Sequence, residues 1–152
     1  MMDEQSAQLT LRAGDQVYGL AVENVVEVAA MVALDPVPEA PPAVLGVANR
    51  HGAAVPIIDL RRVFDHPETP INSASLFVVV VYNNVMVGLV ADEVLQVQYL
   101  TPSATPVTAA GRYIKDIVGH NARLIQIIDL GALISAQLPD NFVLEGDSTT
   151  TS

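Results

Sequence analysis

The residues best suited to chemistry in this 152-residue sequence are two aspartates that end matching apolar runs. Asp59 follows residues 57–58 and Asp129 follows residues 127–128, and both pairs read Ile-Ile. An aspartate after an apolar run can be a phosphoacceptor, but that site also needs an acidic pair and a lysine after a later strand. The only lysine is Lys115, and no acidic pair follows an early strand. We therefore predict that both aspartates cap short helical turns, where a carboxylate accepts free backbone N–H groups.

Other candidate chemistry has little support in the residue types. His51, His66 and His120 lie in turn-like positions without the spacing of converging metal ligands, and the chain has no cysteine. The serines fall mostly in linkers and termini without a nucleophile motif, and no glycine-rich phosphate loop is present. A two-carboxylate acid–base site stays open, because carboxylates are common. We predict no catalytic residue, no metal and no cofactor.

Charge and hydropathy restrict the class of protein further. The formal net charge is −10 at pH 7, which disfavours nucleic acid and anionic membrane surfaces as partners. The longest apolar run, residues 76–91, is interrupted by Tyr82, Asn83 and Asn84, which makes it too short for a membrane helix. The polar, acidic start is unlike a signal peptide. We predict a cytoplasmic protein with no direct membrane insertion.

Short runs rich in valine and isoleucine alternate with turn residues, which is typical of strands and hairpins. The predicted hairpins join residues 9–12 to 16–22, 44–48 to 53–58, 76–81 to 85–91, and 114–118 to 123–128. Proline-bearing stretches at 35–42 and 101–106 should be extended connectors, because proline withholds a ladder donor.

The strongest signal is an internal repeat. Gly19-Leu-Ala-Val-Glu-Asn-Val-Val-Glu-Val returns 69 residues later as Gly88-Leu-Val-Ala-Asp-Glu-Val-Leu-Gln-Val, and Ile-Ile-Asp-Leu at 57–60 returns 70 residues later at 127–130. Each copy has about the number of strands that a small barrel needs to close its edges. We predict an all-β domain over residues 8–138, made of half-domains at about 8–70 and 71–138. Exchange of strands between the halves stays open, and the polar tail 139–152 is expected to be disordered.

At this level of detail the chain resembles the CheW family of chemotaxis coupling proteins. The matching segments are Tyr18–Leu20, Val25–Val28, Gly46–Gly52, Val55–Arg61 and Val87–Val94. The resemblance implies two intertwined SH3-like barrels with a few short helical turns. It also implies a non-catalytic adaptor that joins the cytoplasmic tips of chemoreceptors to the regulatory domain of a CheA-type histidine kinase.

The resemblance also implies which residues meet the partners. The expected receptor-binding groove contains Val25, Glu27, Val28, Val94 and Val97. The expected partner-binding hairpin contains Gly46, Asn49, Arg50, His51 and Gly52. The valines could equally be core residues, but a charge at position 27 between valines favours partial exposure, because a charge is rarely buried unpaired.

The hairpin departs from the family pattern at one position. The family has arginine at the third place of this segment, where the chain has His51, and Arg50 stands one place earlier. A shift of one residue along a strand reverses the direction of the side chain, and histidine lacks the forked guanidinium. Two alternatives stay open, of which only the first follows from this departure. The adaptor could serve a pilus or surface-motility pathway, or the chain could be a small-ligand or enzymatic barrel with a deep polar pocket between its halves.

Overall fold

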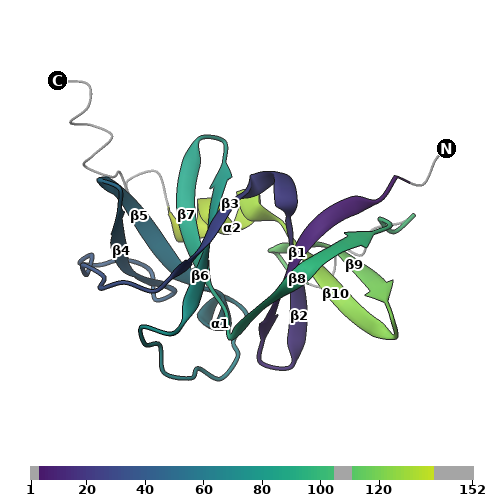
Figure 1. The fold of residues 1–152 in the computed structure, drawn as a ribbon, viewed down its shortest axis with the longest axis horizontal. Coiled ribbons are helices and arrows are strands. Elements are labelled where there is room, and N and C mark those ends of the chain that lie inside the picture. The colour runs from purple at the N-terminus through teal and green to yellow at the C-terminus, as the bar shows by residue number, and fades with distance from the viewer. Residues whose placement is uncertain (1–3, 105–110, 139–152) are drawn as a thin grey trace.

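A computed structural model describes residues 4–104 and 111–138. The predicted tail 139–152 and the end of the second proline-bearing connector lie outside these residues. The elements follow one another in the order shown in Figure 1: β1 (Ser6–Ala13), β2 (Gln16–Ala21), the 3-10 helix η1 (Val22–Asn24), β3 (Val25–Ala30), β4 (Val44–Arg50), β5 (Ala53–Asp59), α1 (Leu60–Val63), β6 (Leu76–Tyr82), β7 (Val85–Val90), β8 (Glu93–Leu100), β9 (Ile114–His120), β10 (Arg123–Ile128) and α2 (Leu130–Gln137).

All four predicted hairpins are confirmed. Asn83 and Asn84 turn the chain between β6 and β7 with φ angles of 50° and 65°, a left-handed conformation that asparagine tolerates. Two of the turns are shorter than predicted, because β4 continues through Arg50 and β9 through His120. Longer strands give Arg50 and His120 defined directions on a sheet, which matters for the site.

The strands form two five-stranded sheets, and each sheet combines strands from both copies of the repeat. Sheet A has the order β8-β1-β2-β10-β9, and sheet B has the order β3-β6-β7-β5-β4. We call the barrels that they form barrel A and barrel B. The first hairpin of each copy therefore belongs to the sheet of the other copy (Figure 1). The all-β, two-barrel fold class is confirmed, and the strand exchange makes the two halves intertwined.

The repeated glycines lie where the exchanged strands meet. Gly19 on β2 pairs in parallel with Ile127 on β10, and Gly88 on β7 pairs in parallel with Ile57 on β5. A Cβ atom added at Gly19 would lie 3.0 Å from Cδ1 of Ile127, and one at Gly88 would lie 2.5 Å from Cδ1 of Ile57. Each copy thus supplies the glycine that makes room for the isoleucine of the other copy.

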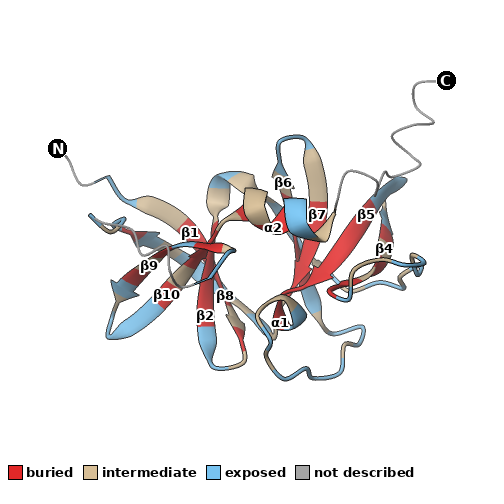
Figure 2. Cartoon of the chain, turned by 180° about the vertical axis from the view of Figure 1, so that it is seen from behind, coloured by how far each residue is buried: buried red, intermediate tan, exposed pale blue. Residues whose placement is uncertain are grey.

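The largest hydrophobic cluster lies between the sheets and draws on both (Figure 2). It includes Leu11 and Leu20 from sheet A, Val78 and Leu89 from sheet B, and Leu133 from α2, all fully buried. Smaller clusters fill each barrel separately. Because the main core is shared, the two barrels should unfold together rather than as independent units.

The two repeated aspartates occupy the N-caps of the helices. The Asp59 carboxylate accepts a hydrogen bond from the Arg61 amide, and the Asp129 carboxylate accepts one from the Ala132 amide at 3.0 Å. Helix α2 is eight residues long, more than the single turn that the sequence predicts. Its extension buries Leu133 and Ile134 in the shared core.

Candidate functional site

Strand β3 is an edge strand with one inward and one outward face. Val26 and Val28 are 46% and 42% exposed, whereas Val25 and Ala29 are partly buried and pack on hydrophobic clusters. Residues two apart on a strand share a face, so the two exposed valines form one outward apolar stripe.

Strand β8 repeats this arrangement in sheet A. Leu95, Val97 and Tyr99 are 38%, 47% and 62% exposed on one face of the strand. By the 69-residue repeat, Leu95 corresponds to Val26 and Val97 to Val28. Both stripes lie on strands at sheet edges, and apolar rows of this kind are uncommon on a surface without a partner. We call these five residues the paired apolar stripes.

The structure separates the groove residues that the resemblance implies. Val28 and Val97 lie on the paired apolar stripes, but Val25 and Val94 pack against the shared core. Glu27 is partly buried and directed away from the exposed valines. Three exposed residues of the stripes, Val26, Leu95 and Tyr99, were not among the predicted groove residues. The alternation along each strand could have indicated their exposure.

Glu27 forms an ion pair with Arg50 of the next hairpin. The Arg50 Nε atom lies 2.5 Å from Oε2 of Glu27. This hydrogen bond lowers the pKa of Glu27 below its usual value and raises that of Arg50. The arginine therefore joins β4 to β3 across the barrel instead of pointing into solvent.

The rest of the predicted hairpin divides between turn and core. His51 is exposed at the turn with a φ angle of 55°, and the Gly52 amide donates to Oδ1 of Asn49 at 2.9 Å. Gly46 is buried, and a Cβ there would lie 2.7 Å from the carbonyl oxygen of Asp35. Gly46 thus permits the backbone pairing between Asp35 and Val47. Of the predicted hairpin residues, only Asn49, His51 and Gly52 are exposed.

A buried ionic network joins the two barrels beside the start of β8. Arg61 is 2% exposed, and its Nε and Nη2 atoms donate to the Asp59 carboxylate at 2.9 and 3.1 Å. Its Nη1 atom donates to Oδ1 of Asp92 at 3.2 Å and to the Thr69 carbonyl at 2.9 Å. Asp92 also accepts from the Gly14 amide at 2.7 Å. The network therefore connects α1, the β1–β2 turn and β8.

The pKa values of the network reflect these bonds. Hydrogen bonding to Asp59 raises the pKa of Arg61 despite its burial. Burial alone would raise the pKa of Asp92, but hydrogen bonds from Gly14 and Arg61 outweigh it and hold the pKa below its usual value. Both groups stay charged at neutral pH. Sequence analysis missed this network, because its members are far apart in the chain.

The network also bears on the alternative of an enzymatic or small-ligand pocket between the halves. A hollow of about 180 Å³ lies there, lined by Arg61, Thr69, Leu76, Asp92 and Val94 among others. Its converging polar groups already bond to one another, so they are not arranged to receive a substrate. The deep polar pocket that this alternative requires is not what the structure describes at this junction.

The histidines do not converge. His66 lies against Tyr18, with 2.7 Å between the Tyr18 hydroxyl and Nε2, and burial raises the pKa of Tyr18 to about 12. Among residues 4–104 and 111–138, no group of three or more His, Asp or Glu side chains is placed to hold a metal ion. In the same part of the chain, no helix is long and apolar enough to cross a membrane.

The fold and the site together define a class: an intertwined two-barrel module whose main surface feature is a pair of apolar edge strands. Comparison with known proteins gives this class a family. A family model described as the CheW-like domain matches residues 8–138, and the chain belongs to this family.

Individual relatives agree with this assignment. The chain is 28% identical over 126 residues to a chemotaxis protein CheW of Bacillus subtilis, covering 79% of this chain and 81% of the relative. It is 36% identical over 84 residues to the protein FrzA of Myxococcus xanthus, covering 55% of this chain and 52% of the relative. The crystal structure of the scaffolding protein TtCheW from Thermoanaerobacter tengcongensis has the same fold. Its TM-score is 0.70 at 24% identity, over 84% of this chain and 89% of that one.

Proposed function

We propose that this protein is a non-catalytic chemosensory adaptor that couples the cytoplasmic tip of a chemoreceptor to a CheA-type histidine kinase. The observation that carries the proposal is the paired apolar stripes. Two edge strands related by the repeat each present exposed apolar side chains, which suits the apolar face of a helical receptor tip. Membership of the CheW-like family and the chemotaxis relatives support this role.

The adaptor acts by geometry in this proposal. The shared core and the strand exchange make the two barrels one rigid body, so partners bound at different surfaces keep a fixed distance and orientation. A change in the conformational equilibrium of one partner then shifts the conformational equilibrium of the other through the adaptor. The kinase regulatory domain is assigned to the hairpin tips and connectors, including Asn49–Gly52.

The direct experiment is titration of the purified protein with a receptor-tip fragment and, separately, with a kinase regulatory domain. Val28→Asp places a charge in the apolar stripe and should weaken receptor binding about tenfold or more, because it desolvates a charge at the contact. The matched control is Leu124→Asp, at a residue 64% exposed on β10 and outside the stripes. Failure of both partners to bind at high micromolar concentration would sink the proposal.

A second candidate is the same adaptor role in a pilus or surface-motility pathway. The observation favouring it is the altered hairpin, where His51 stands at the exposed turn and Arg50 is engaged by Glu27. Titration against kinase domains from flagellar and surface-motility systems separates the candidates. Preference for a flagellar kinase would exclude the second one.

A further inference from the structure

The two barrels differ at their open ends, although the repeat gives both the same backbone. In barrel B the end is crossed by the ion pair of Glu27 on β3 and Arg50 on β4. The Arg50 Nη1 atom also lies 4.0 Å from the Met86 sulfur. These three side chains span the space between β3 and the β4–β5 hairpin, so this end is closed.

Barrel A carries different residues at the corresponding positions. Gln96 replaces Glu27, His120 replaces Arg50, and Val17 replaces Met86. A neutral amide and an imidazole cannot make the guanidinium–carboxylate pair, and valine is shorter than methionine. Within the described residues, the Gln96 and His120 side chains make no hydrogen bond with each other.

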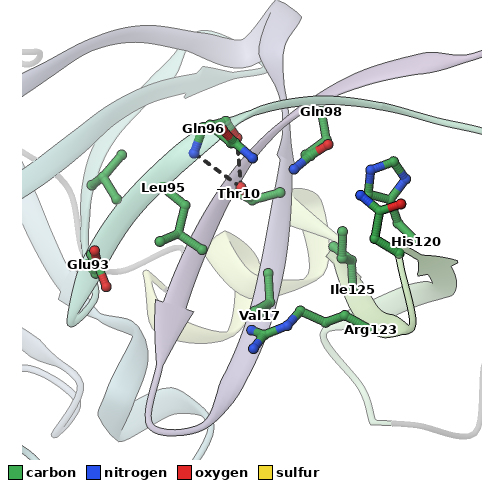
Figure 3. A pocket seen from close by; sticks show the side chains of 11 residues that line it. Thr10, Val17, Glu93, Leu95, Gln96, Gln98, His120, Arg123 and Ile125 are labelled. Carbon is green, nitrogen blue, oxygen red and sulfur yellow. Dashed lines mark hydrogen bonds between the residues drawn. The ribbon is translucent and has the colours of Figure 1, made fainter.

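A hollow of about 480 Å³ lies at these positions of barrel A, with Gln96, His120 and Val17 in its lining. Gln96, Gln98, His120 and Arg123 line it from opposite sides, as Figure 3 shows. Its floor is formed by Thr10, Val17 and Ile125. Thr10 bonds to the Gln96 backbone at 2.6 Å, which leaves the Gln96 side-chain amide outside that contact.

The charges around the hollow favour an anionic ligand, although the whole chain is acidic. Arg123 extends toward Val17 across the hollow and makes no ion pair within the described part of the chain (Figure 3). The one carboxylate of the lining, Glu93, is bonded to Arg12 with 3.2 Å between Nε and Oε1. Its charge is thereby compensated, and the guanidinium of Arg123 is left facing the space.

We propose that the open end of barrel A binds an acidic side chain from an extended segment of a partner protein. The carboxylate would bond to Arg123 and to the Gln96 and Gln98 amides, and so replace the missing half of the ion pair that closes barrel B. The small apolar floor suits a carboxylate flanked by aliphatic residues. This site adjoins the apolar stripe of β8, with which it shares Leu95, but its proposed ligand is a carboxylate and not an apolar helix face. The proposal does not depend on the identity of the receptor.

The test uses the full chain and a capped pentapeptide, Gly-Val-Glu-Val-Gly, followed by backbone NMR. We expect saturable shifts at Thr10, Gln96, His120 and Arg123. The control peptide with glutamine in place of glutamate should bind about threefold to fivefold more weakly, the range of a solvent-exposed charge pair. That difference should shrink in high salt.

Two variants make the test specific. Gln96→Glu combined with His120→Arg copies the pair of barrel B, closes the hollow without removing Arg123, and should abolish the peptide shifts. Arg123→Gln keeps the hollow but should equalise the two peptides. All three substituted positions are exposed or half-exposed, and a dispersed NMR spectrum confirms folding. Equal binding of the two peptides to the wild-type chain, peptide binding that survives closure, or shifts confined to other surfaces would each overturn the proposal.

Discussion

The two junctions between the barrels are equivalent by the repeat but are built differently. At one, Arg61 joins Asp59 and Asp92 in a buried ionic network. At the other, the position of Arg61 is taken by Gly131, which lies against the ring of Tyr82. The difference shows that the exchanged backbone does not depend on the network, since the second junction has the same topology without it.

What the network adds is fixed placement of β8. Asp92 is the residue directly before β8, and its carboxylate accepts hydrogen bonds from Arg61 and from the Gly14 amide. The corresponding start of β3 is held to β6 by a single side-chain hydrogen bond, from the Asn24 amide to the Val81 carbonyl at 3.0 Å. The start of β8 is therefore anchored by buried charges and the start of β3 by a neutral bond.

The largest expected effect comes from Arg61→Ala. This change removes the nearest cation from the carboxylates of Asp59 and Asp92 and leaves them only longer pairs, with Arg62 at 3.9 Å and Arg12 at 3.8 Å. Breaking a buried ion pair in this way costs about 3–5 kcal/mol. Urea denaturation should report that loss in the free energy of unfolding.

The neighbouring Arg62→Ala is the control, because Arg62 is 41% exposed and lies 3.9 Å from the Asp59 carboxylate, against 2.9 Å for Arg61. Its closer pair, with Glu68, is exposed on both sides, so the loss should be about 1 kcal/mol or less. Equal losses in the two variants would refute the unequal roles of the two arginines.

The repeated glycines should respond unequally to a methyl group. A Cβ at Gly88 lies 2.5 Å from Ile57 and 2.8 Å from Phe77, so Gly88→Ala should cost about 1–3 kcal/mol through overpacking. Gly19→Ala meets Ile127 at 3.0 Å and should cost less. Thermal denaturation shows which variant loses more stability. A larger loss of stability for Gly19→Ala than for Gly88→Ala would contradict the packing around the two glycines.

Asp92→Asn should cost about 1–2 kcal/mol at neutral pH, since it weakens charge-assisted bonds to Arg61 and Gly14. The folded pKa of Asp92 lies below the usual value of an aspartate, so the folded chain binds fewer protons there than the unfolded chain. Its contribution is complete above that value and is lost as pH falls through the lower folded pKa. Stability of the variant, measured by denaturation from pH 5 to 2, should therefore decline less steeply than that of the wild type. If the stabilities of the variant and the wild type fell in parallel, Asp92 would not be responsible for the loss of stability in acid.

The smallest effect is expected at the second junction. Gly131→Ala gains helix propensity, but its Cβ would lie 2.9 Å from the Tyr82 ring, which is partly exposed and can move. The net change should stay within about 0.5 kcal/mol. In a Tyr82→Ala background the same substitution should stabilise the protein by about 0.5–1 kcal/mol. A large loss in both backgrounds would mean that the glycine is needed for the backbone itself.

The sequence predicts the strands, the turns and the repeat well, because alternation and turn residues such as Asn83 and Asn84 are local signals. It predicts the exposed face poorly. Both registers of the segment at 25–30 contain valine, and the charge of Glu27 suggested exposure. The partner that draws Glu27 inward, Arg50, is 23 residues away and reaches it only in the closed barrel. The Arg61–Asp92 pair escaped prediction for the same reason.

The most direct test of the adaptor account is methyl NMR of the valine- and leucine-labelled protein titrated with a receptor-tip fragment. We predict that the methyl groups of Val26, Val28, Leu95 and Val97 shift together with one affinity, while that of Leu124 stays unchanged. The contrary result is binding that leaves these four signals in place and perturbs other surfaces. That outcome would remove the paired apolar stripes from the receptor contact.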